Sequence, residues 1–376
     1  MPMKEQESST KRRASGFSLP ELLVSMALAL IALLVIGSVV LTNDRFQRAT
    51  IGTSDAQTTG SLALYAIERD ARMAGYGLAN SNALGCSPIQ YYYSAGGAGC
   101  GAECYSRPAN AASALPDLGF APVVIENGAA GAPDAVTFAF ANPRGRVIPG
   151  TLKEDMSQPS AELRMEEITG FGVNELIVAF QPGVGCALMQ VTQIQGASAQ
   201  RLLHDAGGGI PYNPDADSSL FPTFTKGALV FNLGRPIVRR YDVANAQLRI
   251  VDYFSYASPT ALPTFNTGAE VLYDQIVDLQ AEYGKDTDND QVVDTWDNVT
   301  PAPGSADWLQ ILAIRVGVLA RSRDEARPEG GACRATTVLP AWEGGDFALP
   351  GGVPSCFKYR VFETVIPLRN MIWRES

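Results

Sequence analysis

Histidine is almost absent from this chain, because His204 is the only one among its 376 residues. No serine stands in a G-x-S-x-G elbow, so a catalytic serine triad would lack its nucleophile. The sequence also has no phosphate-binding P-loop, no G-x-G-x-x-G fingerprint and no H-E-x-x-H zinc motif. We therefore predict that the protein is not an enzyme, and we interpret His204 as a surface or loop residue.

Positive charge is scarce as well. The chain has 29 Lys and Arg against 39 Asp and Glu, which gives a formal net charge of -10. Removing residues 1–16 would take away four basic and two acidic residues, leaving 25 against 37 and a net charge of -12. Nucleic acids and anionic membrane surfaces attract basic proteins, so we expect no nucleic-acid partner. The chain is long enough for a sizeable core, in one large domain or two smaller ones.

Charge is missing over most of residues 17–41, where Glu21 is the only charged residue. As a helix rising about 1.5 Å per residue, this run is about 37 Å long, enough to cross a hydrocarbon core of about 30 Å with some tilt. A basic leader precedes it, with Lys4, Lys11, Arg12 and Arg13. The run is too long for a cleaved secretory signal, whose apolar core has about 7–15 residues. A plain signal anchor, with its basic flank inside, remains open.

Glu21 needs a partner, because a carboxylate a few residues inside a membrane helix is costly and a lone helix offers none. Cleavage between Gly16 and Phe17 would create a free amine on a neighbouring copy or on another subunit of a helical bundle. Such an amine could pair with the Glu21 carboxylate. The pattern thus points to a processed helix that assembles with others.

The run Gly16-Phe17-Ser18-Leu19-Pro20-Glu21, behind a basic leader and ahead of an apolar helix, resembles the class III signal of type IV prepilins and type II secretion pseudopilins. The resemblance implies that a prepilin peptidase cuts after Gly16 and methylates the new N-terminal residue, Phe17. It also implies that Glu21 pairs with the N-terminal amine of an adjacent subunit during assembly. Pro20 is compatible with a helix start, because a proline in the first turn loses no intrahelical hydrogen bond.

Landmarks near the C-terminus extend this resemblance. They are Ile276-x-x-Leu279-Gln280-x-x-Tyr283-Gly284, then Ile314-Arg315-Val316, and finally Leu368-Arg369-Asn370. These segments are similar to the large minor pilins of the PilW group, which are related to the J-type pseudopilins. Residues 78–260 carry no such resemblance and are interpreted from their own pattern.

The sequence predicts the α+β class, in which a long N-terminal transmembrane and amphipathic helix packs on a largely antiparallel, pilin-like β-sheet head. One helix is expected from residue 17 to about residue 74. Its second half is amphipathic, with Leu62, Ile67 and Met73 on the apolar side and Asp70 on the polar side. We expect these regions: a leader at 1–16, a transmembrane or filament-core helix at 17–41, an amphipathic continuation at 42–75, and a periplasmic head of one or two subdomains at 76–376.

Short β-branched or aromatic runs predict the strands of the head. They lie at 135–141, 175–181, 187–194, 228–233, 236–242, 247–254, 309–321 and 357–368. The run at 309–321 is apolar on both faces apart from Arg315, so we expect a central, buried strand there. Residues 270–282 have a mixed period and are interpreted as a short helix that leads into a strand.

Six cysteines, an even number outside the cytoplasm, suggest disulfides. Cys333 and Cys356 form the natural C-terminal pair. Three more, Cys86, Cys100 and Cys104, crowd one Gly-rich loop, so one of them is expected to reach Cys186. The full connectivity stays open, because six cysteines allow 15 pairings. A metal site at Cys100-x-x-x-Cys104 is the weaker alternative, because the single histidine is far away in sequence.

Acidic residues alternate in the segment Asp286-Thr-Asp288-Asn-Asp290-Gln-Val-Val-Asp294. Calcium takes about six to eight oxygen ligands, and an EF-hand-like loop spaces them in this way. The expected ligands are the carboxylates of Asp286, Asp288, Asp290, Asp294 and Asp297 and the carbonyl of Val292. Gln291 stands where such loops want glycine, and the last ligand is Asp instead of Glu. We expect a structural Ca2+ ion, and the alternative is a solvated acidic turn.

The resemblance implies a minor pilin that takes part in initiating or capping a type IV pilus, at its tip, and so in cell adhesion and twitching motility. Its expected partners are the prepilin peptidase, the inner membrane, other minor pilins, the major pilin and a tip adhesin. The protein would span the inner membrane once, with its head in the periplasm, and would then join the extracellular pilus. Two alternatives stay open, a J-like type II secretion pseudopilin and a membrane-anchored periplasmic binding or adhesion module. A mere anchor should tolerate Ala at Glu21, whereas an assembling subunit should not.

Overall fold

The computed structural model describes residues 18–78, 83–95, 104–106, 115–145, 147–159, 162–196, 199–206, 209–214, 221–258, 261–326, 333, 335–349, 352–353 and 356–372, apart from the side chains of residues 45, 46, 48, 49 and 51. The chain divides into two compact units, Met1–Gly52 and Thr53–Ser376. We call the first the N-terminal unit and the second the head, and each is described by itself.

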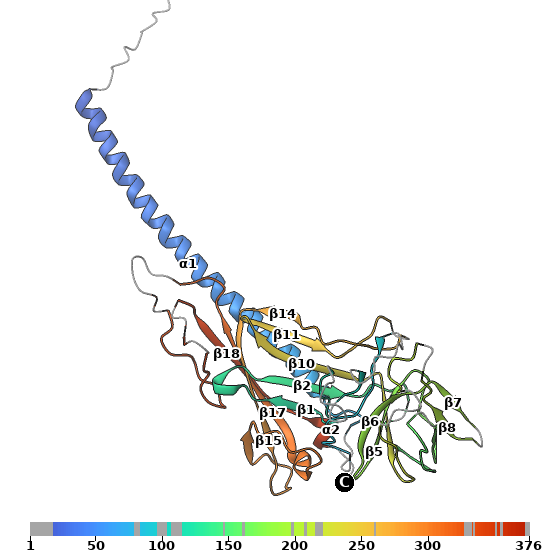
Figure 1. Cartoon of the computed structure of the whole chain (residues 1–376). Helices are drawn as coiled ribbons and strands as arrows, with labels where there is room; N and C mark the ends of the chain where they lie inside the picture. Colours follow the sequence, from blue (N-terminus) through green and yellow to red (C-terminus); the bar gives the residue numbers. More distant parts are fainter. Residues whose placement is uncertain are drawn as a thin grey trace, which may run out of the picture. The chain divides into compact units, whose positions relative to one another are not determined.

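A single long helix, α1 (Leu19–Met73), opens the described part of the chain (Figure 1). Its segment Leu19–Asp44 is, among the described residues, the one helix long and apolar enough to cross a membrane. The large apolar side chains of this segment are exposed. Gly75 and Gly77 follow the helix with φ of 81° and 71°, the left-handed conformation that ends helices without steric cost. The helix predicted over residues 17–74 is confirmed for its described part.

Two antiparallel sheets of the head lie around the second half of α1. The five-stranded sheet has the order β1-β2-β10-β11-β14, with β1 (Val123–Glu126), β2 (Ala135–Phe140), β10 (Ile237–Ala244), β11 (Gln247–Asp252) and β14 (Glu270–Asp274). The four-stranded sheet has the order β16-β15-β17-β18, with β16 (Thr295–Asp297), β15 (Ile276–Lys285), β17 (Ile311–Arg321) and β18 (Tyr359–Pro367). The central position predicted for the strand at 309–321 is confirmed by β17.

The largest core of the head joins α1 to both sheets. From α1 it takes small residues and one isoleucine: Ala56, Ala63, Ile67, Ala71 and Ala74. From the sheets it takes β-branched, leucine and aromatic side chains of β1, β2, β10, β11, β15, β17 and β18. Small residues let the helix approach closely, and a Cβ added at Gly60 would overlap the ring of Phe362 on β18. Gly60, which costs helix propensity, is therefore explained by packing.

The remaining strands form a second part of the head, with cores of their own (Figure 1). One sheet has the order β3-β9-β5-β6, with β3 (Gly150–Thr151), β9 (Leu229–Gly234), β5 (Leu176–Gln181) and β6 (Gly185–Gln190). Another has the order β4-β8-β7, with β4 (Leu163–Arg164), β8 (Arg201–Leu203) and β7 (Gln193–Gln195). A two-stranded ribbon pairs β12 (Phe254–Ser255) with β13 (Thr264–Phe265). Short helical turns complete the described elements: η3 (Ala129–Gly131), η4 (Ala306–Gln310) and α2 (Arg369–Ile372).

Two sequence interpretations of this region are wrong. Residues 270–282 contain no helix, because β14 and β15 follow each other directly around Gln275, whose φ is 61°. The chain changes sheets at this residue, which gives the run its mixed period. The amphipathic face of α1 was misassigned in part, because Leu62 and Met73 are 44% and 45% exposed and Asp70 is buried, whereas Ile67 is buried as predicted.

Candidate functional site: the helix start and the acidic loop

The start of α1 places Glu21, the only charged residue among residues 17–41, in a hydrogen-bonded cap. Ser18 precedes the helix, and its backbone N–H and its hydroxyl donate to Glu21 Oε2, at 3.3 and 3.2 Å. The Leu22 N–H closes the first turn by donating to the Ser18 carbonyl, at 3.1 Å. A carboxylate in a first turn also interacts favourably with the positive end of the helix dipole. The chain itself thus supplies polar partners for Glu21, which the sequence analysis missed.

The other polar side chains of this apolar segment also bond within the helix. Ser25 donates to the Glu21 carbonyl at 2.7 Å, Ser38 to the Val35 carbonyl at 2.8 Å, and Thr42 to the Ser38 carbonyl at 2.8 Å. Such back-bonding satisfies hydroxyls where no water is available. The segment is therefore suited to lipid or to close contact with other helices. Gly16 and Phe17, the predicted processing residues, lie outside the described residues.

The predicted calcium ligands lie on a β-hairpin of the four-stranded sheet. The strands β15 and β16 pair through Lys285 and Thr295, and residues 286–294 connect them. The loop is anchored at both ends, because the Asp286 N–H donates to the Gln310 carbonyl at 2.8 Å and the Asp294 N–H to the Lys285 carbonyl at 2.9 Å. Gln291 adopts a φ of 70°, so it takes the left-handed conformation that a glycine would take at this position.

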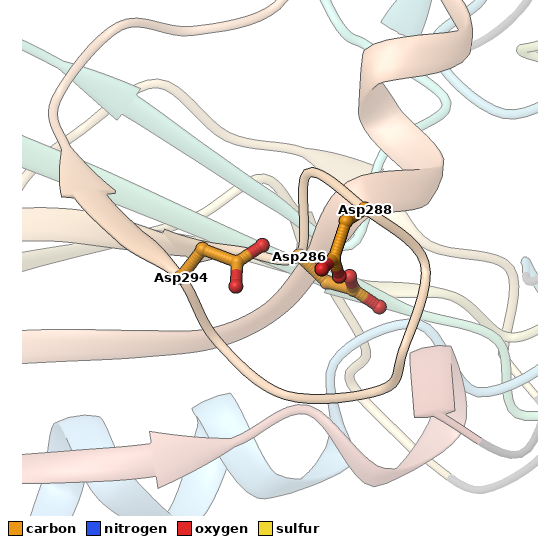
Figure 2. A group of neighbouring side chains, drawn as sticks. All are labelled: Asp286, Asp288 and Asp294. Carbon is orange, nitrogen blue, oxygen red and sulfur yellow. The ribbon is translucent and has the colours of Figure 1, made fainter.

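Three of the predicted ligands converge. Asp286, Asp288 and Asp294 each offer a carboxylate oxygen, and these oxygens lie within 4.8 Å of one another. Figure 2 shows Asp294 facing Asp286 and Asp288 across the loop. Asp286 is buried and accepts from the N–H groups of residues 290 and 291, at 3.2 and 2.8 Å, while the other two are exposed. The arrangement can offer a cation three carboxylate oxygens.

The other predicted ligands have different partners. The Asp290 carboxylate accepts from the Val292 N–H at 2.8 Å, and the Val292 side chain is 60% exposed. Asp297 pairs with Lys285 Nζ at 2.6 Å and also accepts from the Val299 N–H at 2.9 Å. The Asp297 carboxylate is therefore not one of the three that converge. It forms an ion pair with Lys285, which lies two strand positions away on β15.

Charge in the loop is unevenly stabilised. Desolvation, with the neighbouring carboxylates of Asp290 and Asp294, raises the pKa of Asp288. Hydrogen bonds from the N–H and hydroxyl of Thr287 lower the pKa of Asp294. Asp294 is thus held as an anion by its own loop, whereas Asp288 lacks comparable support and would gain from a bound cation. The three carboxylate oxygens could supply part of the ligands of a calcium ion, and the calcium assignment stays a prediction.

Disulfides close the head at two places, as the sequence suggests. Cys86 is bonded to Cys186 across 100 residues of sequence, and Cys333 to Cys356 across 23. Cys104 is also disulfide-bonded. Cys100 lies outside the described residues. The first bond ties the loop before β1 to β6, and both of its cysteines pack in one core of the second part of the head.

A buried charge network, which the sequence analysis missed, fixes α1 to the five-stranded sheet. The Asp70 carboxylate accepts from the Tyr241 hydroxyl at 2.6 Å and from Arg239 Nη1 at 3.3 Å. Arg239 also pairs with Asp252 at 3.2 Å. Of the two partners of Arg239, Asp70 lies 169 residues away in sequence and Asp252 lies 13 residues away.

Several large aromatic side chains have packing roles. Tyr91 and Tyr92 are buried, and Trp308 and Trp342 are 2% and 8% exposed. His204 is buried too, at 1% exposure, so the expectation of a surface position is wrong and only its place outside the strands is right. Among the described residues, this leaves the helix start and the acidic loop as the sites to relate to function.

Comparisons with known proteins agree with both ends of the chain. Residues 255–370 match the family model described as type IV pilus-assembly protein W, PilW. Residues 11–41 match the prokaryotic N-terminal methylation motif. No curated protein matches the chain. Among solved structures, a type IV-like pilin from Thermus thermophilus is similar to this chain, with a TM-score of 0.33 and 12% sequence identity. The match covers 83% of this chain and 95% of that chain.

The methylation motif, the apolar helix and the antiparallel sheet head together define the class, a type IV pilin-like protein. The PilW match over residues 255–370, which include β15 to β18, gives the head a PilW domain. The pilin signature implies processing by a prepilin peptidase, anchoring in the membrane and interaction with other pilus components.

Proposed function

We propose that this protein is a minor pilin that initiates or caps the assembly of a type IV pilus, with its head at the tip. The observation that carries the proposal is one helix that combines the methylation motif over residues 11–41 with a capped carboxylate and exposed apolar side chains. The PilW domain in the head supports it. A bulky head suits a tip position, because it need not repeat along the shaft.

In this proposal, cleavage between Gly16 and Phe17 makes Ser18 the second residue of the mature chain. Before assembly the Ser18 N–H and hydroxyl satisfy Glu21, which lowers the cost of holding a carboxylate in the bilayer. During assembly the N-terminal amine of an adjacent subunit becomes the partner of Glu21. An ion pair with an amine is stronger than bonds from a neutral hydroxyl, so the carboxylate favours the assembled state.

The experiment counts surface pili on cells that lack the gene and are complemented with the native chain or with Glu21→Ala. The native chain should restore pili and Glu21→Ala should not. Glu68→Ala is the matched control, because Glu68 lies on the same helix but outside the apolar segment and pairs only with Arg72 in the described structure. Normal pili in cells without the gene would contradict a priming role, and protein secretion would then be assayed to test a pseudopilin.

The specific partners belong to the same proposal: other minor pilins, the major pilin and a tip adhesin. Cross-linking from the head should capture pilins when pili form. A head that cross-links to no pilin in piliated cells, while the chain stays in the inner membrane, would favour a membrane-anchored binding module instead.

A further inference from the structure

A cleft of about 390 Å3 opens in the head where β18 begins beside α1. Its walls come from three segments that are distant in sequence. The described lining is Thr53 and Ala56 of α1, Ala335 and Thr336 of the loop before β18, and residues 358–360. The Cys333–Cys356 disulfide fixes two of these walls, because residues 335–336 follow one cysteine and residue 358 follows the other.

The charge of this cleft is opposite to that of the chain. Lys358 and Arg360 are the charged residues of its described lining, which contains no carboxylate. Arg360 donates to the amide oxygen of Gln57 at 3.4 Å, and neither cation has an ion pair within the described residues. Elsewhere in the head, arginines such as Arg240 and Arg315 are paired with carboxylates. Two exposed cations without an ion pair among the described residues thus lie side by side in a chain of net charge -10.

The two cations belong to the face of the sheet that lies toward α1, and both are exposed. Side chains two residues apart on a strand point to the same face, so Lys358 and Arg360 share the face of Phe362, which packs against Gly60. This face thus changes from apolar to cationic where the cleft opens. Charged side chains can protect an edge strand such as β18 from pairing with another chain. Protection alone does not explain why hydroxyl-bearing residues gather around the cations.

Two threonines, Thr53 and Thr336, also belong to the lining, whereas the Tyr359 side chain points to the opposite face of the sheet, where it packs against the core around Leu319. Guanidinium, ammonium and hydroxyl groups arranged on several walls match an anion whose oxygens point in several directions. A tetrahedral phosphate has this geometry, whereas a planar carboxylate presents only two oxygens. We propose that the cleft between α1, the Cys333–Cys356 disulfide and Lys358–Arg360 binds a phosphate group, carried by a free ion or by a lipid headgroup.

The test uses the few lysines of the chain. Beyond residue 16 there are four, Lys153, Lys226, Lys285 and Lys358. Reductive methylation with a 13C label keeps them charged and gives each one an NMR signal in the full chain held in neutral detergent. Added inorganic phosphate should shift the Lys358 signal in a saturable way and leave Lys153 and Lys226 unchanged. Arg360→Gln should raise the half-saturating concentration at least about tenfold, as expected for one lost charged hydrogen bond.

Two control variants separate the effect of the charge in the cleft from the effect of any lost charge. Arg360→Lys keeps the charge and should retain most of the binding. Arg323→Gln removes the same charge from an exposed position outside the described lining and should leave the half-saturating concentration unchanged. Parallel shifts of all lysines, as ionic strength alone would produce, would overturn the proposal, and so would an unmoved Lys358 signal.

Lipid and free phosphate are distinguished in nanodiscs without added phosphate. A Lys358 shift in phosphatidylglycerol discs, absent in phosphatidylcholine discs, identifies the anionic headgroup as the source. A shift that needs added inorganic phosphate in both discs identifies the free ion. A poly-glutamate peptide that shifts Lys358 while phosphate does not would refute phosphate and indicate a carboxylate partner.

Discussion

Replacing Asp278 by asparagine should stabilise the head at neutral pH. Asp278 lies on β15 and is fully buried. Its Oδ1 accepts from Gln280 Nε2 at 2.9 Å, while its Oδ2 is buried without a hydrogen-bond partner in the described part of the chain. Burial, with a smaller contribution from the nearby carboxylate of Asp134, raises the pKa of Asp278 to about 6. The hydrogen bond from Gln280 acts in the opposite direction and lowers this pKa. Asp134 cannot relieve Asp278, because both its oxygens already accept from backbone N–H groups.

The magnitude follows from the difference between the folded and unfolded pKa values. The ordinary value of 3.8 rises to about 6, so the folded state binds this proton more tightly than the unfolded state. Asp278 therefore costs nothing below about pH 4, and its unfavourable effect grows as the pH rises and is complete above about pH 6. Each pH unit is worth about 1.4 kcal/mol, so full ionisation lowers the stability by about 3 kcal/mol. Asparagine keeps the Oδ1 acceptor and removes this charge.

The assay is urea unfolding of the full chain in neutral detergent, followed by the fluorescence of its tryptophans, of which Trp308 and Trp342 are buried. Asp278→Asn should raise the free energy of unfolding by about 3 kcal/mol near pH 7.5 and leave it nearly unchanged near pH 4. The exposed Asp274→Asn, on β14, is the control and should show no such pH dependence. An equal effect of Asp278→Asn at both pH values, or destabilisation near pH 7.5, would refute the reasoning.

Three further predictions use the same unfolding assay. Gly60→Ala should destabilise the head by about 1–3 kcal/mol, because the new methyl overlaps the Phe362 ring and this outweighs the gain in helix propensity. Tyr241→Phe should cost about 1–3 kcal/mol, because it removes the buried donor to the Asp70 carboxylate. Millimolar Ca2+ should raise the unfolding midpoint of the native chain, and Asp288→Asn should reduce that rise, since it removes one of three converging carboxylates.

Each of these has a matched control on the same chain. Gly37→Ala should be neutral or slightly stabilising, because nothing lies within 4 Å of the added Cβ. Tyr65→Phe should have little effect, because Tyr65 is 63% exposed. Asp307→Asn, at an exposed carboxylate outside the acidic loop, should leave the response to Ca2+ unchanged. A calcium response that is absent in the native chain, or equal in Asp288→Asn, would leave the loop as a solvated acidic turn.

The sequence predicted elements well where one pattern persists over many residues. The apolar run and its polar flanks were sufficient for α1, and β-branched runs were sufficient for β5, β10 and β17. Short strands such as β3 and β4, with two residues each, were missed, because two residues show no alternation. The face of α1 was misassigned for another reason. Asp70 is buried only because Tyr241 and Arg239 satisfy it, and such long-range partners leave no local signal.

The acidic loop shows the same division between local and long-range information. The spacing of Asp286, Asp288 and Asp294 was enough to group them, because a short loop must hold its own residues close together. Asp297 belongs to β16, and its carboxylate is taken by Lys285 on the paired strand. The register of the two paired strands decides that contact, and this register cannot be predicted from the spacing of the acidic residues along the chain.

The cores of the head suggest how one fold can serve both assembly and recognition. The core that holds α1 is built largely from β1, β2, β15, β17 and β18, and the PilW match over residues 255–370 includes its last three strands. Of the two cores to which β5, β6 and β9 contribute, one contains, among the described residues, no residue of α1 and none beyond Val230. Substitutions there leave the packing of the helix untouched, so this part can vary without changing how a subunit fits its neighbours. It also carries exposed apolar side chains at Ile148, Val173 and Val184. For the proposed minor-pilin function, we therefore expect partner specificity to reside in residues 142–234, and the fit into a filament in α1 and the PilW domain.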